Sequence, residues 1–237
     1  MRWRNFVEQT LSTTVTHHSR VGGGDFAEAF RLVCADGRRV FLKTHQQPPT
    51  DFFVIEATGL EWLRAPGCIN VPRVLGVSND PHCLLMEWIE LGHATHTTEA
   101  ELGRGLAALH ATGHSCFGRT DCKTTGSLAL PNEPLETWSE FFATQRLLPL
   151  ARIASERKSL PASTIEQLEN VANRLDTLGV PEESPAMLHG DLWAGNRVVD
   201  STGSSWLIDP AAHGGHREFD LAMMNVFGGF GRDCFAA

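Results

Sequence analysis

The sequence predicts an α+β protein with two lobes, a small antiparallel sheet with one helix over residues 1–88 and a mainly helical part over residues 89–237. Two observations carry this prediction. Short alternating segments between turn residues dominate the first part, which is typical of antiparallel strands. Longer segments with apolar residues three and four positions apart dominate the second part, which is typical of helices that bury one face.

Composition narrows the class of protein. The 237 residues are 42% hydrophobic, enough for a substantial core, and their formal net charge of −8 disfavours a surface that binds nucleic acid. No apolar run approaches the roughly 20 residues of a membrane helix, and the first residues lack a signal-peptide core. The six cysteines form no C-x-x-C pair, which favours buried thiols in a reducing compartment. We therefore expect a cytoplasmic protein without membrane contact.

The first elements are a helix and a hairpin. Residues 3–16 have helical apolar spacing, and alternating segments over 27–34 and 39–44 flank Asp36-Gly37, a strong two-residue hairpin signal. Both segments are expected to pair antiparallel.

A glycine-rich stretch precedes this hairpin at Gly22, Gly23 and Gly24. Glycines here would let backbone N–H groups close over phosphates. Three consecutive glycines also occur in plain flexible turns, and the pattern is neither a Walker A loop nor a dinucleotide fingerprint.

Lys43 is predicted to share a strand face with Phe41, on the side opposite to Val40 and Leu42. The helical stretch 51–64 supplies a partner, because Glu56 falls within its apolar stripe and a carboxylate there is costly unless it is paired. A Lys43–Glu56 pair would match the arrangement in which a lysine holds nucleotide phosphates. Taken alone, an edge lysine and a solvated glutamate would be about equally compatible with the sequence.

Two further strands are expected over residues 71–77 and 82–89. The second ends at Met86, Glu87 and Trp88, where the small lobe would pass to the large one and the backbone would contact adenine. This assignment rests on the order of the elements, and a plain core strand fits the local residues equally well.

The second part is predicted to contain helices over 98–112, 138–154 and 163–178, and another that begins at 216. The connection 114–134 is rich in glycine and proline. Its length indicates a functional surface, because unstructured connections of this length are uncommon in compact domains.

One short hairpin organises the chemistry. Strands are predicted over 197–200 and 205–208, and equal arms would place Asn196 opposite Asp209. Asp191 lies five residues before Asn196, so three oxygen-bearing side chains converge. Such a set suits Mg²⁺. Asp and Asn are also common turn formers, but three of them behind His189-Gly190 make that interpretation the weaker one.

The order of a base, an asparagine and then an aspartate after a hairpin is how kinases position a hydroxyl and Mg²⁺. HGD stands where protein kinases carry H-R-D, and Asp209-Pro210-Ala211 stands where they carry D-F-G. We call the stretch around His189, Gly190 and Asp191 the catalytic turn. Asp220 is expected either to accept backbone N–H bonds from this turn or to be a simple acid in the first turn of a helix.

From about Val21 to its end the chain resembles the fructosamine kinase (ketosamine-3-kinase) family, within the aminoglycoside phosphotransferase and protein-kinase-like superfamily. The stretches that carry the resemblance are VGGGDFAEAFRL, VFLKT, FFVIEATGLEWL, LGRGLAALH, FGRTDCKTTGSLALPN, W-x-x-F-F-x-x-x-R-L-L-P, HGDLWAGN and IDPAAHGGHREFDLAMMNVFGGF. The resemblance implies a two-lobed kinase-like fold, and the chain ends earlier than members of the family usually do.

By this resemblance the chain is a kinase that uses ATP and Mg²⁺ to phosphorylate O3 of ketoamines such as fructosamines or ribulosamines. Its acceptors would be ketoamine small molecules or glycated protein lysines, and its role would be repair of glycated amines. One alternative is a related kinase for an aminoglycoside, an amino alcohol or a simple sugar. Another is a truncated pseudokinase that only binds nucleotide.

The expected mechanism gives each side chain a role. Asp191 accepts the proton of the acceptor hydroxyl or orients that hydroxyl, and Asn196 and Asp209 hold Mg²⁺. Lys43, held by Glu56, steadies the α- and β-phosphates.

Recognition of the acceptor is assigned to Trp193, His216 and Arg217. Trp193 could stack on a sugar or only pack the loop. The oligomeric state is left open by the sequence.

Overall fold

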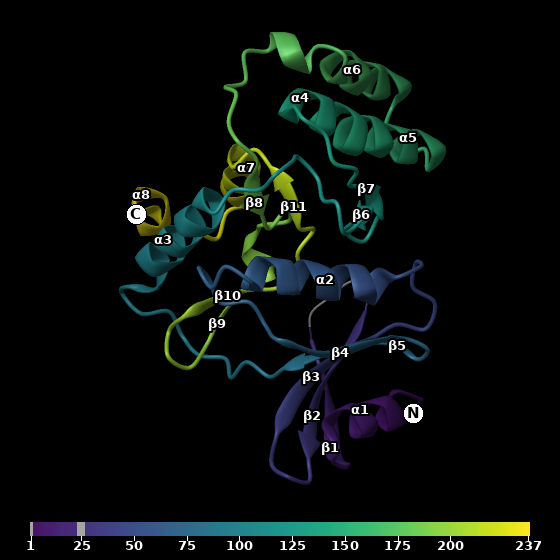
Figure 1. Cartoon of the computed structure of the whole chain (residues 1–237), viewed down its shortest axis with the longest axis vertical. Helices are drawn as coiled ribbons and strands as arrows, with labels where there is room; N and C mark the ends of the chain where they lie inside the picture. Colours follow the sequence, from purple (N-terminus) through teal and green to yellow (C-terminus); the bar gives the residue numbers. More distant parts are fainter. Residues whose placement is uncertain (1, 23–26) are drawn as a thin grey trace.

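The computed structural model describes residues 2–22 and 27–237 (Figure 1). A five-stranded antiparallel sheet has the order β1-β2-β3-β5-β4. Its strands are β1 Val15–Val21, β2 Glu28–Cys34, β3 Arg39–Thr44, β4 Val74–Asn79 and β5 His82–Glu87. The hairpin predicted around Asp36-Gly37 is present, with Phe30 opposite Leu42. The fourth strand begins later than predicted because Pro72 cannot donate to a ladder.

Helix α1 (Arg2–Leu11) covers one face of the sheet and buries Trp3, Val7 and Leu11 against Val40 and Leu42. The predicted helix over 3–16 is therefore too long. The run 13–16 consists of threonines and a valine, whose β-branched side chains favour a strand. It leads into β1, a strand that the sequence pattern did not reveal.

Helix α2 (Phe52–Arg64) lies between the sheet and the helical part of the chain (Figure 1). Its predicted stripe is buried, with Phe53, Leu60 and Leu63 each 1% exposed. Burial of each such side chain contributes about 1.5–3 kcal/mol before entropy is counted. This face holds α2 in place and fixes the direction of Glu56.

The remainder of the chain is mainly helical, as predicted. Its helices are α3 Thr98–Ala111, α4 Trp138–Phe141, α5 Leu148–Glu156, α6 Ala162–Ala172, α7 Glu218–Phe227 and α8 Arg232–Ala236, with shorter turns η1 Phe142–Leu147, η2 Leu175–Thr177 and η3 Ala194–Asn196. The single helix predicted over 138–154 is α4, η1 and α5 in succession. Segment η1 is a π-helix, a form that is rare and occurs frequently at functional sites.

Three two-stranded ladders connect these helices. Their strands are β6 Thr124–Thr125, β7 Leu130–Pro131, β8 Ala186–Leu188, β9 Arg197–Val199, β10 Ser205–Leu207 and β11 His213–Gly215. The connection predicted to be functional contains the β6–β7 pair. We call residues 117–135 the brace hairpin, because backbone bonds join Phe117 to Leu135 at its base.

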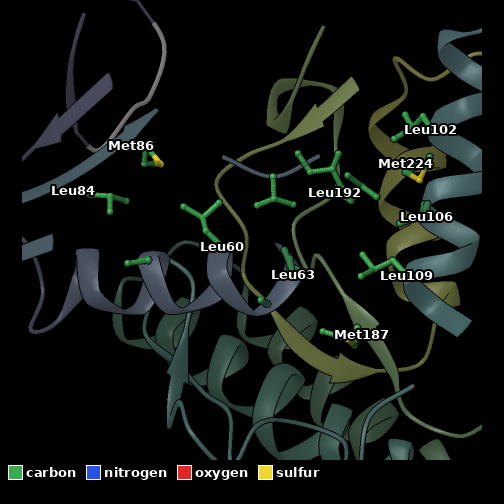
Figure 2. Packing of buried hydrophobic residues seen from close by; sticks show 14 of the residues in the cluster. Leu60, Leu63, Leu84, Met86, Leu102, Leu106, Leu109, Met187, Leu192 and Met224 are labelled. Carbon is green, nitrogen blue, oxygen red and sulfur yellow. The ribbon is translucent and has the colours of Figure 1, made fainter. Parts of the chain in front are cut away.

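One hydrophobic cluster spans both parts of the molecule (Figure 2). Leu60 and Leu63 of α2 and Leu84 of β5 belong to the same cluster as Leu106 of α3 and Met224 of α7. In the part of the chain that the structure describes, no helix is long and apolar enough to cross a membrane.

Candidate active site

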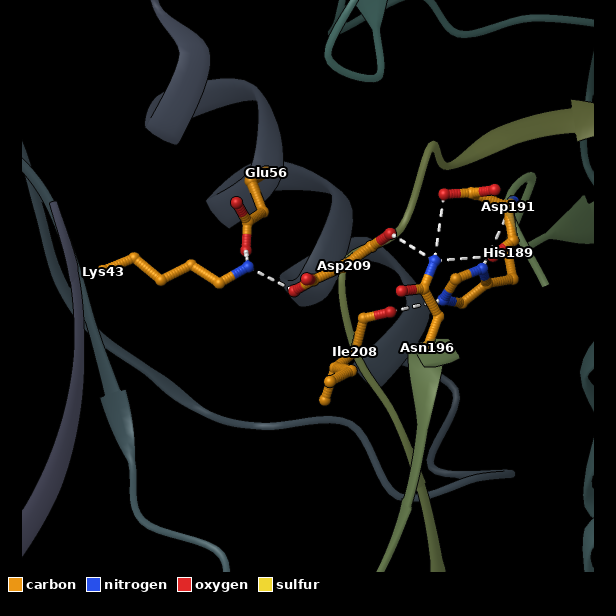
Figure 3. A network of polar contacts seen from close by, with 7 residues as sticks. All are labelled: Lys43, Glu56, His189, Asp191, Asn196, Ile208 and Asp209. Carbon is orange, nitrogen blue, oxygen red and sulfur yellow. Dashed lines mark hydrogen bonds and ion pairs between the residues drawn. The ribbon is translucent and has the colours of Figure 1, made fainter. Parts of the chain in front are cut away.

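Lys43 lies between two carboxylates. Its Nζ is 2.7 Å from Oε1 of Glu56, and it also forms an ion pair with Oδ1 of Asp209 (Figure 3). The side chains of Lys43 and Glu56 are each 12% exposed. The pairing predicted from the apolar stripe of α2 is thus confirmed, and Asp209 is an additional partner that the sequence did not reveal.

This triad has an excess of negative charge. Burial alone would lower the pKa of Lys43, but the charges of Glu56 and Asp209 raise it overall, so the amine stays protonated. Burial raises the pKa of Glu56 to about 7, although Lys43 opposes that rise. Two carboxylates therefore compete for one ammonium, and phosphate groups could replace a carboxylate as a partner of the lysine.

Asp209 adopts a left-handed backbone conformation with φ 55°. A residue other than glycine in this region is strained, and such strain clusters at functional sites. The side chain of Asp209 points toward Lys43, as Figure 3 shows.

The hairpin before Asp209 differs from the prediction by one residue. Asp200 N donates to Ser204 O, so the turn has three residues and includes Gly203 at φ 88°. In this register Asn196 lies opposite Ile208, whose N–H donates to Asn196 O at 2.9 Å. Asp209 follows one position later.

Asn196 nevertheless joins the two aspartates. Its Nδ2 donates to Asp191 O at 2.8 Å, to Asp191 Oδ2 at 2.9 Å and to Asp209 O at 3.4 Å. These bonds turn the amide nitrogen toward the aspartates, so its Oδ1 faces the side of Asp209 (Figure 3). Asp191, Asn196 and Asp209 are thus brought together as predicted.

Burial raises the pKa of Asp191, and nearby His189 and the bond from Asn196 offset part of the rise. A raised carboxylate pKa lies closer to the operating pH, which improves a general base. The position suits a group that takes a proton from an alcohol.

Asp220 supports the catalytic turn from below. Its two oxygens accept the backbone N–H groups of His189 and Gly190 at 2.9 Å each, and His110 Nε2 donates to it at 3.0 Å. Asp220 is 0% exposed. The expectation that it accepts N–H bonds from this turn is confirmed, and His110 is its partner from α3.

The nucleotide side is described in part. A Cβ added at Gly22 would meet no atom of the described residues within 4 Å, and Gly23 and Gly24 lie outside the described residues. Met86 is buried at the end of β5, and Trp88 lies over the Arg31 guanidinium at 5.3 Å. The Glu87 carboxylate accepts the backbone N–H of Arg73, which precedes β4, at 2.6 Å.

The three residues assigned to acceptor recognition lie in different surroundings. Trp193 is 42% exposed beside Asp191. His216 is 3% exposed, and both of its ring nitrogens are bonded, to Pro181 O and to the N–H of Glu218. Arg217 pairs with Glu183 at 2.8 Å. The Trp193 indole is the exposed ring of the three, and one part of it packs closely on Gly195 of its own loop.

The oxygen set fits Mg²⁺. The described residues contain no group of three or more His, Cys, Asp or Glu that could hold a metal on their own. One carboxylate of Asp209 and one amide oxygen of Asn196 are hard ligands, and Mg²⁺ usually completes such a set with water and phosphate oxygens. The residues therefore suit a metal that arrives with a nucleotide.

Sequence reasoning gave no structural role to Trp62, Arg119 and Arg146. Trp62 of α2 contacts Arg119, whose Cζ lies 5.0 Å from the indole centroid, and the ring of His114 at 5.2 Å. Arg146 is 4% exposed and binds the brace hairpin. The sequence signal was present for Arg146, an arginine within an apolar helical run.

Comparison with known proteins gives a consistent answer. The model of the family described as "Fructosamine kinase" matches residues 3–237. The "Probable ketoamine kinase" of Synechocystis sp. is 35% identical over 96% of this chain and 79% of its own length. The "Protein-ribulosamine 3-kinase, chloroplastic" of Arabidopsis thaliana is 31% identical over 95% of this chain and 70% of its own length.

Solved structures agree. The crystal structure of a Thermobifida fusca protein, provisionally assigned as a fructosamine-3-kinase, has a TM-score of 0.86 at 36% identity and covers 98% of this chain and 82% of that one. An aminoglycoside phosphotransferase in complex with ADP and hygromycin B has a TM-score of 0.63 at 16% identity, over 94% of this chain and 75% of that one. The second likeness concerns the kinase-like fold alone.

Proposed function

The chain belongs to the fructosamine kinase family, and on that premise we propose that it transfers a phosphoryl group from ATP to O3 of a ketoamine sugar. One observation carries the proposal. Lys43, Asp191, Asn196 and Asp209 converge from β3, the catalytic turn and the β9–β10 hairpin, although up to 166 positions separate them in the chain. This set can hold phosphates and accept the proton of an alcohol.

In this mechanism Asp191 takes the proton of the O3 hydroxyl or aligns it for attack on the γ-phosphorus. Lys43 neutralises charge on the α- and β-phosphates and is kept in place by Glu56. Mg²⁺, held by Asn196 and Asp209, would neutralise charge on the phosphates. Because little covalent chemistry falls to the protein, positioning and charge neutralisation account for most of the acceleration.

The nucleotide would lie with its base against Met86, Glu87 and Trp88 and its phosphates under Gly22, Gly23 and Gly24. Trp193 would stack on the acceptor sugar, and Arg217 is kept as a second acceptor residue. His216 would support this region through its existing bonds. We place the boundary between the lobes at residues 88 and 89.

The physiological role proposed is repair of glycated amines in the cytoplasm, on small ketoamines or on glycated protein lysines. The six cysteines are free thiols, which is compatible with a reducing compartment. A 3-phosphate on a ketoamine would leave as the adduct decomposes, which frees the amine.

An acceptor panel tests this proposal. Release of ADP from MgATP should be stimulated by fructoselysine or ribuloselysine, and ³¹P NMR should place the phosphate on O3. Aminoglycosides, amino alcohols and simple sugars serve as the competing acceptors. Greater stimulation by one of those would support the related-kinase alternative, and nucleotide binding without any turnover would support a pseudokinase.

A further inference from the structure

Arg146 is a buried cation for which the proposed mechanism has no use. It projects from the π-helical segment η1 and is 4% exposed. Its guanidinium donates to Pro131 O at 2.5 Å, to Gln145 O at 2.9 Å and to Asn132 Oδ1 at 3.0 Å. None of these acceptors is a carboxylate.

A charge that is buried without a counter-ion is costly. Burial lowers the pKa of Arg146 to about 9, so the group remains a cation at neutral pH. An apolar side chain of similar length would fill the same space without that cost. The arginine therefore contributes something that packing alone does not.

Its bonds fix one arm of the brace hairpin. Asn132 is 0% exposed, its N–H donates to Lys123 O, and its own carbonyl accepts the N–H of Arg119. The planar guanidinium donates to Pro131 O and to Asn132 Oδ1 at the same time. A lysine could not form both bonds with the same geometry.

The brace hairpin in turn holds the segment that follows Asp209. Gly118 and Gly214 exchange backbone bonds of 2.8 and 3.0 Å. The carbonyl of Ala212 accepts Asn132 Nδ2 at 3.4 Å and Thr125 Oγ1 at 3.5 Å. The other side of the same segment meets the catalytic turn, where Ala211 N donates to His189 O at 2.9 Å.

A second route reaches the same segment through aromatic rings. Arg146 Cζ lies 4.6 Å from the centroid of Phe141, and Phe141 stacks on His213 at 5.5 Å. His213 Nδ1 donates to Ala211 O at 2.8 Å. Arg146 thus acts on both sides of Ala212, through Asn132 and through Phe141.

We propose that Arg146 is a positioning residue for the metal site. By ordering the brace hairpin it fixes the segment 210–214, and thereby the placement of Asp209 relative to Asp191. This inference rests on the proposed function, since it assumes that Asp209 holds Mg²⁺.

The variant Arg146→Met separates positioning from packing. Methionine keeps much of the volume but leaves Pro131 O and Asn132 Oδ1 without this donor, so a purely structural role predicts at most a lowered unfolding temperature together with normal nucleotide binding. The positioning role predicts a folded protein that needs about 10-fold or more Mg²⁺ for half-maximal binding of a fluorescent ATP analogue, the range seen when outer-shell partners of metal ligands are lost.

Two further variants sharpen the test. Asn132→Asp keeps an oxygen for Arg146 but removes the amide donor to Ala212, and it should raise the Mg²⁺ requirement in the same way even if Arg146→Met fails to fold. Arg152→Met changes an exposed arginine of α5, 73% exposed, and should change nothing.

Each outcome decides one question. A Mg²⁺ requirement in Arg146→Met or Asn132→Asp equal to that of the wild-type protein overturns the inference. Failure of the wild-type protein itself to bind the analogue with Mg²⁺ overturns the proposed function instead.

Discussion

Asp191 and Asp220 lie close to one turn, and their surroundings shift their protonation in opposite directions. Burial raises the pKa of both carboxyls taken alone. For Asp220 the bond from His110, the charges of nearby histidines and the backbone N–H of Gly190 outweigh burial, so its pKa is lowered overall. For Asp191 the charge of His189 and the bond from Asn196 do not outweigh burial, so its pKa is raised overall. The fold therefore keeps one aspartate firmly ionised as a support and leaves the other poised to take a proton.

Asp191→Asn should abolish proton acceptance and leave the nucleotide side intact. We expect kcat to fall by roughly 10²–10⁴, while the dissociation constant of MgATP stays within about three-fold, because Asn keeps the size of the side chain and can still accept a bond from Asn196. Steady-state kinetics and calorimetry measure the two quantities. Normal turnover in this variant would refute the assigned role.

Asp220→Asn should destabilise the protein by about 1–3 kcal/mol for each buried donor that loses its acceptor, because the amide cannot accept the bonds of His110, His189 N and Gly190 N together and turns an N–H toward one of these donors. Because the pKa of Asp220 is lowered in the folded state, its stabilisation is present above the unfolded pKa of about 3.9 and is lost as pH falls through the folded pKa. Urea unfolding at pH 7 and at pH 4 or below checks this. If Asp220→Asn and the wild-type protein had equal free energies of unfolding at pH 7, the supporting role of Asp220 would be contradicted.

For individual residues, the sequence predicted that Asp191, Asn196 and Asp209 come together, and it was wrong by one residue about the register of the hairpin. The Lys43–Glu56 pair could be predicted because a carboxylate in an apolar stripe requires a partner. The one-residue error at Asn196 arose because the length of the turn depends on Gly203 adopting φ 88°, which its identity allows but does not impose. Arg146 stands out in the sequence as an arginine within an apolar helical run, but its acceptors, Pro131 O, Gln145 O and Asn132 Oδ1, follow from no residue pattern.

Helix α2 is the element that connects the two sides of the site. It presents Glu56 to Lys43, and at Gly59 it packs closely on Pro210 and Ala212. A Cβ added at Gly59 would lie 3.4 Å from a side-chain carbon of each. One turn further, Trp62 contacts both His114 and Arg119. The helix is thus fastened to the segment after Asp209 and to the brace hairpin.

Trp62→Ala should loosen this attachment. We expect the KM for MgATP to rise, because Glu56 no longer holds Lys43 firmly, while the KM for the acceptor changes little. Trp62→Phe should restore most of the function, since it keeps an aromatic face for Arg119.

Trp3→Phe serves as a control away from the site, because Trp3 is a buried indole of the small lobe in a separate cluster with α1, whereas Trp62 is only partly buried. An unchanged KM for MgATP in Trp62→Ala, or an equal rise in Trp3→Phe, would contradict the role given to Trp62.

At the scale of elements the sequence placed β2, β3, α2 and α3 within a residue or two, because each shows a clear period and a turn or cap at its end. It missed β1, because a strand with polar residues on both faces has no alternation. It also merged α4, η1 and α5, because the extra residue in a π-turn leaves the apolar spacing nearly unchanged.

At the scale of the whole molecule, the cluster that joins α2 and β5 to α3 and α7 makes the sheet and the helical part interdependent. We therefore expect a single unfolding transition, in contrast to two lobes that melt separately. MgATP at about 100 times its dissociation constant should stabilise the protein by about 2.7 kcal/mol, or roughly 5–10 °C for a chain of this size. Calorimetric scans would show two separate transitions, or no shift with MgATP, if this expectation is wrong.

The most direct test of the account is a crystal structure of the protein with Mg²⁺ and a non-hydrolysable ATP analogue. We predict Mg²⁺ bound by Asp209 Oδ and Asn196 Oδ1, phosphates on Lys43 Nζ, and the Asp191 carboxylate facing the γ-phosphate across space for a hydroxyl. A metal held by other side chains, or a nucleotide bound away from Lys43, would contradict it.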